Sequence, residues 1–154
     1  MNKLSLLVSL GLILLLSSCA STLMLRSHHS AITQLARGTL PPQETFEKLS
    51  GVLVEVFKDA LSLPNPDQRI NFLRKFTKQN DEAIGQILNR LQGWQSDMKP
   101  MEKIQFVTSA LKDPSTAELA RMLPQILQLV KDDDKSMGNM RKLLLLYRLK
   151  QLMN

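Results

Sequence analysis

The chain has little of what disulfide-stabilised proteins and most enzymes depend on. Among its 154 residues there is one cysteine, so no disulfide can form within a chain. There are two histidines, and aromatic residues are limited to five Phe, one Trp and one Tyr. The stability of a folded domain must therefore come from the packing of Leu, Ile, Val and Met side chains.

The few residues that could bind a metal do not have the spacing of a metal site. His28 and His29 are adjacent, and adjacent side chains on a helix point about 100° apart. Asp132–Asp134 is a run of three carboxylates between two lysines, whereas calcium loops alternate ligands with spacer residues. We therefore predict no metal site, and we expect the aspartates to lie at a helix end.

Catalytic side chains are equally scarce. A single glutamate can act in helical enzymes that cleave cell-wall glycan, and Glu55 and Glu118 lie in predicted helices. Glycoside cleavage usually needs a second carboxylate or a shaped groove lined with aromatic residues. We predict no catalytic residue, and a glycan hydrolase is kept as an alternative.

Acidic residues are missing from the end of the chain. The whole sequence carries 20 Lys and Arg against 14 Asp and Glu. Residues 135–154 contain five of these basic residues and no acidic one. The excess positive charge therefore belongs to one predicted helix rather than to the whole domain. Because these cations are not interleaved with aromatic residues and no nucleic-acid motif is present, we predict no nucleic-acid binding.

A hydrophobic run near the start of the chain is too short to cross a bilayer. Residues 4–16 are apolar except for two serines and a glycine, and as a helix they would span about 20 Å. A membrane-spanning helix needs about 20 residues. The run follows Lys3 and has the proportions of the hydrophobic region of a secretory signal.

The residues that end this run, Leu16-Ser17-Ser18-Cys19, resemble the lipobox of bacterial lipoproteins, in which an aliphatic residue and two small residues precede a cysteine. The resemblance implies that residues 1–18 are removed as a signal peptide. It also implies a diacylglycerol on the Cys19 thiol and an acyl chain such as palmitate on its amino group, with no other cofactor. Two or more chains give stable membrane attachment. Ala20, in place of an aspartate, implies the outer membrane, facing the periplasm, in a host with two membranes.

Two other interpretations of the leader stay open, namely an ordinary secretory signal cut at Ser18 or Ala20 and an uncleaved anchor. In the lipoprotein interpretation, residues 19–40 are a lipid-anchored tether. Ser30–Arg37 could form about two helical turns that end at Gly38. If the tether is flexible, 20 residues reach about 25 Å root-mean-square.

Residues 41–154 have the pattern of one all-α domain, with five or six helices in antiparallel hairpins. The first predicted helix, Gln43–Ser62, repeats apolar residues at steps of mostly three and four. Pro64 and Pro66 follow it and favour its ending there. Inside a later predicted helix, Pro124 is expected to kink or break the backbone near Ala120.

A similarity at an offset of 34 residues predicts two copies of a helical hairpin. Pro66–Leu73 and Pro100–Val107 are identical or chemically close at seven of eight positions. We predict the hairpins at about 66–97 and 100–131, and coincidence between two amphipathic helices is the alternative. The predicted N-terminal caps of these helices are Asn65, Asn80 and Asp113.

A last helix is predicted from Met137 to Leu152, with Ser136 as its cap. The apolar side of this helix is wider than packing against one neighbouring helix requires. The helix is therefore a candidate surface for a partner helix or for anionic membrane headgroups. The predicted partner-binding residues are Met140, Leu144, Leu145, Tyr147, Arg148, Leu149 and Leu152. The alternative is a core helix whose basic side chains extend to solvent.

These observations predict a non-enzymatic, membrane-anchored protein that binds another envelope protein or assists an assembly, through the region around Met140 to Leu152 or through the groove between the predicted hairpins. Besides the hydrolase, a carrier of an apolar ligand stays open. A hydrolase requires a carboxylate at the floor of a cleft, whereas a carrier requires a sizeable enclosed apolar cavity.

Overall fold

The computed structural model describes residues 22–149, and within this range all regular secondary structure is helical. Residues 22–37 form what we call the N-terminal helix. Five further helices follow, so the prediction of an all-α fold with five or six helices is confirmed. Their bounds are α2 (Pro42–Ser62), α3 (Pro66–Asp97), α4 (Pro100–Lys112), α5 (Pro114–Val130) and α6 (Asp134–Leu146).

Local sequence explains where most of these helices begin. Helices α2 to α5 each begin at a proline, which is favoured at the first helical position because its missing N–H has no partner there in any case. Two of the predicted caps are confirmed. The Asn65 side chain accepts the Gln68 N–H at 2.9 Å, and Asp113 accepts the Thr116 N–H at 3.0 Å.

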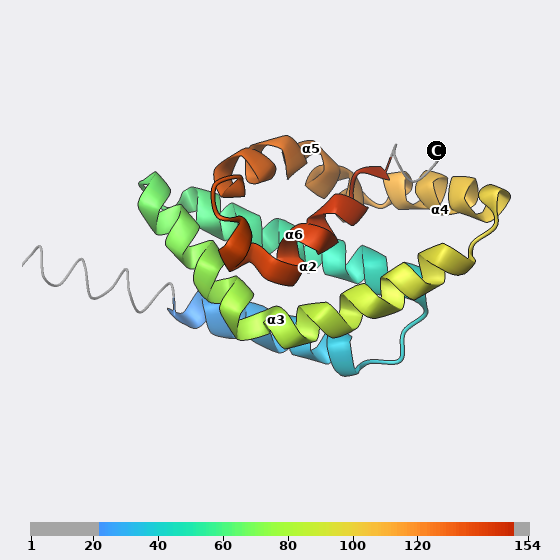
Figure 1. Cartoon of the computed structure of the whole chain (residues 1–154), viewed down its shortest axis with the longest axis horizontal. Coiled ribbons are helices and arrows are strands. Elements are labelled where there is room, and N and C mark those ends of the chain that lie inside the picture. Colours follow the sequence, from blue (N-terminus) through green and yellow to red (C-terminus); the bar gives the residue numbers. More distant parts are fainter. Residues whose placement is uncertain (1–21, 150–154) are drawn as a thin grey trace, which may run out of the picture.

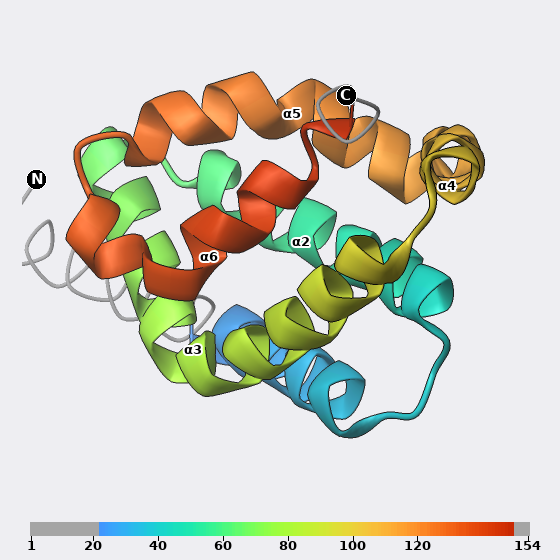
Figure 2. The same ribbon diagram turned by 45° about the vertical axis from the view of Figure 1, so that its right-hand side comes forward.

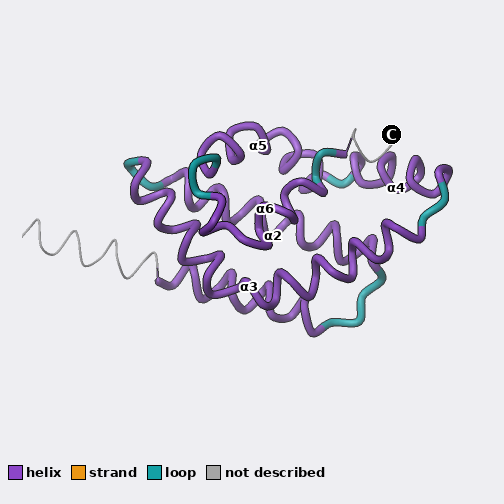
Figure 3. The backbone as a smooth tube through the Cα atoms, in the orientation of Figure 1, coloured by secondary structure: helices purple, strands orange, loops and turns teal. Residues whose placement is uncertain are grey.

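The helices pack in layers joined by short connections. Figure 2 shows α2 and α6 between α5 on one side and α3 with the N-terminal helix on the other. Among helices α2 to α6, the most extensive contacts are α3 with α6, α2 with α5 and α2 with α3. Figure 3 shows that loops are confined to the short segments between helices. Figure 1 shows the N-terminal helix, in blue, starting towards one end of the molecule and α4 at the other.

One continuous apolar core contains side chains from every helix. Four of the few aromatic residues form a connected cluster in it. Phe46 stacks on Tyr147 with ring centres 4.5 Å apart, and Phe106 meets both Phe46 and Trp94 edge-on at 5.0 and 4.6 Å. Such ring pairs contribute about 0.5–1.5 kcal/mol beyond the area they bury. The cluster therefore joins α2, α3 and α4 to the residue that follows α6.

Much of the predicted tether is part of this core. Ile32 is fully buried, and Leu25 and Leu35 of the N-terminal helix are also in the core. His28 Nε2 lies 2.6 Å from the Asp59 carboxylate, and the Arg90 guanidinium donates to the backbone carbonyls of Leu35 and Gly38. Because these contacts come from α2 and α3, the sequence of residues 22–37 alone does not reveal them. The predicted end of this helix at Gly38 agrees with the structure.

The predicted hairpin over 66–97 is wrong, because α3 is one helix of 32 residues. Asn80, the expected cap, is buried in the middle of α3. Its amide donates to the Phe76 carbonyl at 2.7 Å, and its oxygen lies 2.7 Å from His29 Nδ1. With its hydrogen bonds made inside the structure, the asparagine does not interrupt the helix.

The second predicted hairpin is present as two helices, but they are not antiparallel. Figure 2 shows α4 nearly end-on while α5 lies across the view, so the two meet at an elbow at Asp113. The offset of 34 residues therefore marks two similar helix starts rather than a repeated hairpin. Phe72 and Leu73 of α3 are buried, and so are Phe106 and Val107 at the matching positions of α4.

Two further helix boundaries differ from prediction. Helix α5 continues through Pro124, so of the two expected effects, a kink or a break, the break is absent. Helix α6 begins at Asp134 rather than after a Ser136 cap, and it ends at Leu146 rather than at Leu152. Gly138 has a φ of 43° and a ψ of −123° within α6, which divides this helix into two segments.

Candidate functional site

The predicted partner-binding residues separate into a buried and an exposed group. Met140, Leu144, Tyr147 and Leu149 are between 1% and 4% exposed and belong to the core. A partner cannot reach these four side chains in this conformation. Leu145 is 39% exposed, and Arg148 is also exposed. Leu152 lies outside the described residues.

A buried polar cluster fixes the position of the chain after α6. The Tyr147 hydroxyl donates to the Phe46 carbonyl at 3.2 Å, and the Ser50 hydroxyl lies 3.2 Å from the same Tyr147 oxygen. Thr116 of α5 donates to Ser50 at 2.9 Å. Burial raises the pKa of the Tyr147 hydroxyl above its ordinary value, so the tyrosine stays neutral and hydrogen-bonded.

An apolar groove lies beside this fixed segment. It has a volume of about 440 Å³, is open to solvent, and is bounded by the end of α4, the middle of α5 and residues 147–149. Figure 2 shows the chain after α6 returning to α5 near the end that follows α4. The lining residues are Leu111, Ala120, Leu123, Pro124, Leu127, Tyr147, Arg148 and Leu149. We call this feature the α4–α5 groove.

The outer face of α4 extends this apolar surface. Met101, Ile104 and Leu111 are 66%, 45% and 48% exposed, and Leu111 also lines the groove. Phe106 and Val107 of the same helix are buried, so α4 is apolar on both its inner and its outer side. Sequence reasoning missed this face, although apolar residues on both sides of a short helix are a visible signal.

One charged side chain gives the groove polar character. Among residues 22–149, Arg148 is the one charged residue that lines it. Pro124, which also lines the groove, has no N–H, so the Ala120 carbonyl lacks the donor four residues later that an uninterrupted helix would supply. The groove can therefore accommodate apolar groups together with an anion.

The other residues considered from sequence are placed elsewhere. Glu118 forms an ion pair with Lys58 at 3.0 Å, and the hydrogen bond that the Lys58 ammonium donates to this carboxylate raises the pKa of Lys58. Glu55 is exposed and lines a shallow hollow that also contains His28 and Lys48. The structure does not bring Glu55 or Glu118 to the floor of the α4–α5 groove.

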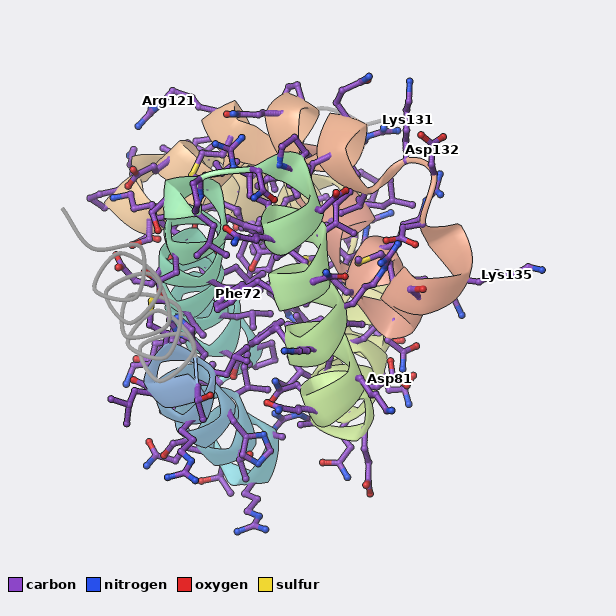
Figure 4. The ribbon with its side chains drawn as sticks, turned by 90° about the vertical axis from the view of Figure 1, so that its left-hand side faces the viewer. Phe72, Asp81, Arg121, Lys131, Asp132 and Lys135 are labelled. Carbon is purple, nitrogen blue, oxygen red and sulfur yellow. The ribbon has the colours of Figure 1, made fainter. Side chains whose placement is uncertain are left out.

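The aspartate run lies at the connection between α5 and α6, as expected. Figure 4 shows Lys131 and Asp132 extending outward at this connection and Lys135 extending outward from α6. Asp133 accepts two hydrogen bonds from the Arg74 guanidinium, at 2.7 and 3.0 Å. Among residues 22–149 no group of three or more His, Cys, Asp and Glu side chains is arranged to hold a metal ion.

No helix in the described part of the chain combines the length and hydrophobicity needed to cross a membrane. Comparison with protein-family models, curated proteins and solved structures gave no match for this chain.

Proposed function

We propose that this chain is a lipid-anchored protein of the bacterial envelope that acts as a non-enzymatic binding module for another envelope protein. The observation that carries the proposal is the α4–α5 groove and its continuation along the exposed side of α4. Contiguous exposed apolar surface on a folded domain commonly marks a binding site. The partner would bind here rather than on the buried side of α6.

The position of the anchor is compatible with this use of the groove. Cys19 precedes Thr22, the first described residue, by three positions, and three residues span at most about 11 Å. Figure 1 shows the start of the N-terminal helix, in blue, and α4 towards opposite ends of the molecule. An acyl group on Cys19 would therefore hold one end near the bilayer while the groove stays accessible to a partner at the other.

The anchor is tested by mass spectrometry of the protein purified from its own membranes. We expect a mature chain that begins at Cys19 and carries the mass of a diacylglyceryl group and an amide-linked acyl chain. An intact Met1 together with an unmodified Cys19 thiol would contradict the anchor.

Binding at the groove is tested by photo-crosslinking in native membranes. A photoreactive benzoylphenylalanine is placed at Leu111, which lines the groove, and separately at Lys78, which is exposed on α3. We expect one discrete crosslinked protein from position 111 and none from position 78. Identical products from both positions, or no product from position 111, would argue against this binding site.

A further inference from the structure

The charge of the α4–α5 groove indicates which partner chemistry it would select. Arg148 is exposed, and among the described residues no acidic side chain lines the groove. Within residues 22–149 the Arg148 guanidinium takes part in no ion pair or side-chain hydrogen bond. Arg141 and Lys142, which precede it in α6, line a separate hollow beside Asp81, so Arg148 is the cation that an occupant of the groove would meet. An anionic group on the occupant would therefore find a cation with no competing carboxylate at this site.

The shape of the surface favours a helix as the occupant. From Met101 to Leu111 the exposed side of α4 extends about 15 Å at 1.5 Å per residue, and the groove continues it. A helix docks in such a groove through apolar side chains at steps of three and four residues. A single acyl chain is better held in a cavity that encloses most of its surface, and this groove is open.

We infer that the occupant of the α4–α5 groove is an amphipathic helix of the partner protein, with an acidic side chain at the edge of its apolar face that pairs with Arg148. This inference rests on the proposed function and specifies the partner. The apolar contacts would supply affinity, whereas the Arg148 pair would fix orientation and accelerate association at low ionic strength.

The test uses full-length protein in detergent and two synthetic peptides of about 18 residues, a length that allows helix formation. Both peptides have leucines at helical spacing and differ in whether Glu or Lys flanks the apolar face. Affinity is measured by fluorescence anisotropy for the wild type and for Arg148→Glu. The matched control is Arg121→Glu, because Arg121 is exposed on α5 but does not line the groove, and Figure 4 shows its side chain directed away from the body.

We expect the wild type to bind the Glu peptide at least tenfold more tightly than the Lys peptide. Arg148→Glu should reverse this preference, whereas Arg121→Glu should preserve it. Circular dichroism confirms that each variant is folded, and the comparison of the two peptides on wild-type protein does not depend on any variant.

Several results would overturn the inference. Equal affinities for the two peptides, no binding of either, or the same effect from Arg121→Glu as from Arg148→Glu would each reject an acidic helix paired with Arg148. Binding of oleate at the groove, with neither peptide bound, would reject a helix in favour of an acyl ligand. These outcomes differ from failure of the proposed function, which would appear as the absence of a crosslinked protein from position 111.

Discussion

At the scale of single residues, Tyr147 illustrates how a polar group can stabilise a core. The side chain is 1% exposed, stacks on Phe46 and has its hydroxyl within reach of two oxygen atoms. A buried hydroxyl without such partners would cost free energy. Hydrogen bonds to these two oxygen atoms hold Tyr147 in place. They therefore also fix residues 147–149, which form a wall of the α4–α5 groove.

Replacing this tyrosine by phenylalanine measures the hydrogen bonds separately from the packing. We expect Tyr147→Phe to lower the free energy of unfolding by about 1 kcal/mol, because the Ser50 hydroxyl keeps the Phe46 carbonyl as its acceptor at 2.8 Å. Tyr147→Ala, which also leaves a cavity, should cost about 3–5 kcal/mol. Urea denaturation followed by circular dichroism measures both values, and equal losses would contradict the importance of the ring.

The raised pKa of Tyr147 predicts a loss of stability in alkaline solution. Above the ordinary tyrosine pKa of about 10, the unfolded chain releases this proton whereas the folded chain retains it. The contribution to folding is therefore fully present below about pH 10. It falls by about 1.4 kcal/mol per pH unit above that value, until the folded form also titrates. The difference between wild type and Tyr147→Phe in urea denaturation should show this slope, and a difference independent of pH would contradict it.

At the scale of helices, two glycines should respond in opposite ways to alanine. Gly138 has a positive φ that L residues rarely adopt, and an added Cβ would lie 3.1 Å from an Asp81 carboxylate oxygen. We expect Gly138→Ala to cost about 1–3 kcal/mol of stability. Gly93 is inside α3, and an added Cβ there meets nothing within 4 Å, so Gly93→Ala should stabilise by about 0.5–1 kcal/mol.

Thermal unfolding of the two variants checks this pair. The prediction fails if both substitutions shift the melting temperature in the same direction, since the kink at Gly138 would then be of no consequence for α6.

Helix positions were predictable from sequence where local signals decide them. The prolines that begin α2 to α5 and the Asn65 and Asp113 caps are short-range features, and each is where the sequence indicates. The unbroken course of α3 was not predictable, because Asn80 is satisfied by His29 from another helix. The apolar outer face of α4 was missed for a different reason: helical periodicity identifies which residues are apolar but not which side of a helix is covered.

At the scale of the whole molecule, α6 is a structural part of the core. Met137, Met140, Leu143 and Leu144 are nearly fully buried, and the contact of α6 with α3 is the most extensive between any two of the helices α2 to α6. The sequence left open whether this helix is core or interface, and the buried side supports the first. The basic residues of α6 therefore belong to a helix that contributes to the core.

A chain truncated after Asp134 should therefore lose its cooperative fold. Each buried side chain contributes about 1.5–3 kcal/mol. The burial free energy lost with several of them exceeds the free energy of unfolding of a domain of this size. Differential scanning calorimetry should show no cooperative transition for the truncated chain. A retained transition would show that the remaining helices form a core without α6.

The packing of the N-terminal helix has a consequence for the order of events during maturation. If Cys19 is acylated as proposed, the processing site lies close in sequence to Thr22, the first described residue of a helix that includes the buried Ile32 and the His28–Asp59 contact. Enzymes that cut and acylate a chain require access to an extended stretch of it. We therefore expect processing to precede docking of this helix. A precursor that folds before processing would be a poor substrate for these enzymes. Export would therefore have to be faster than folding.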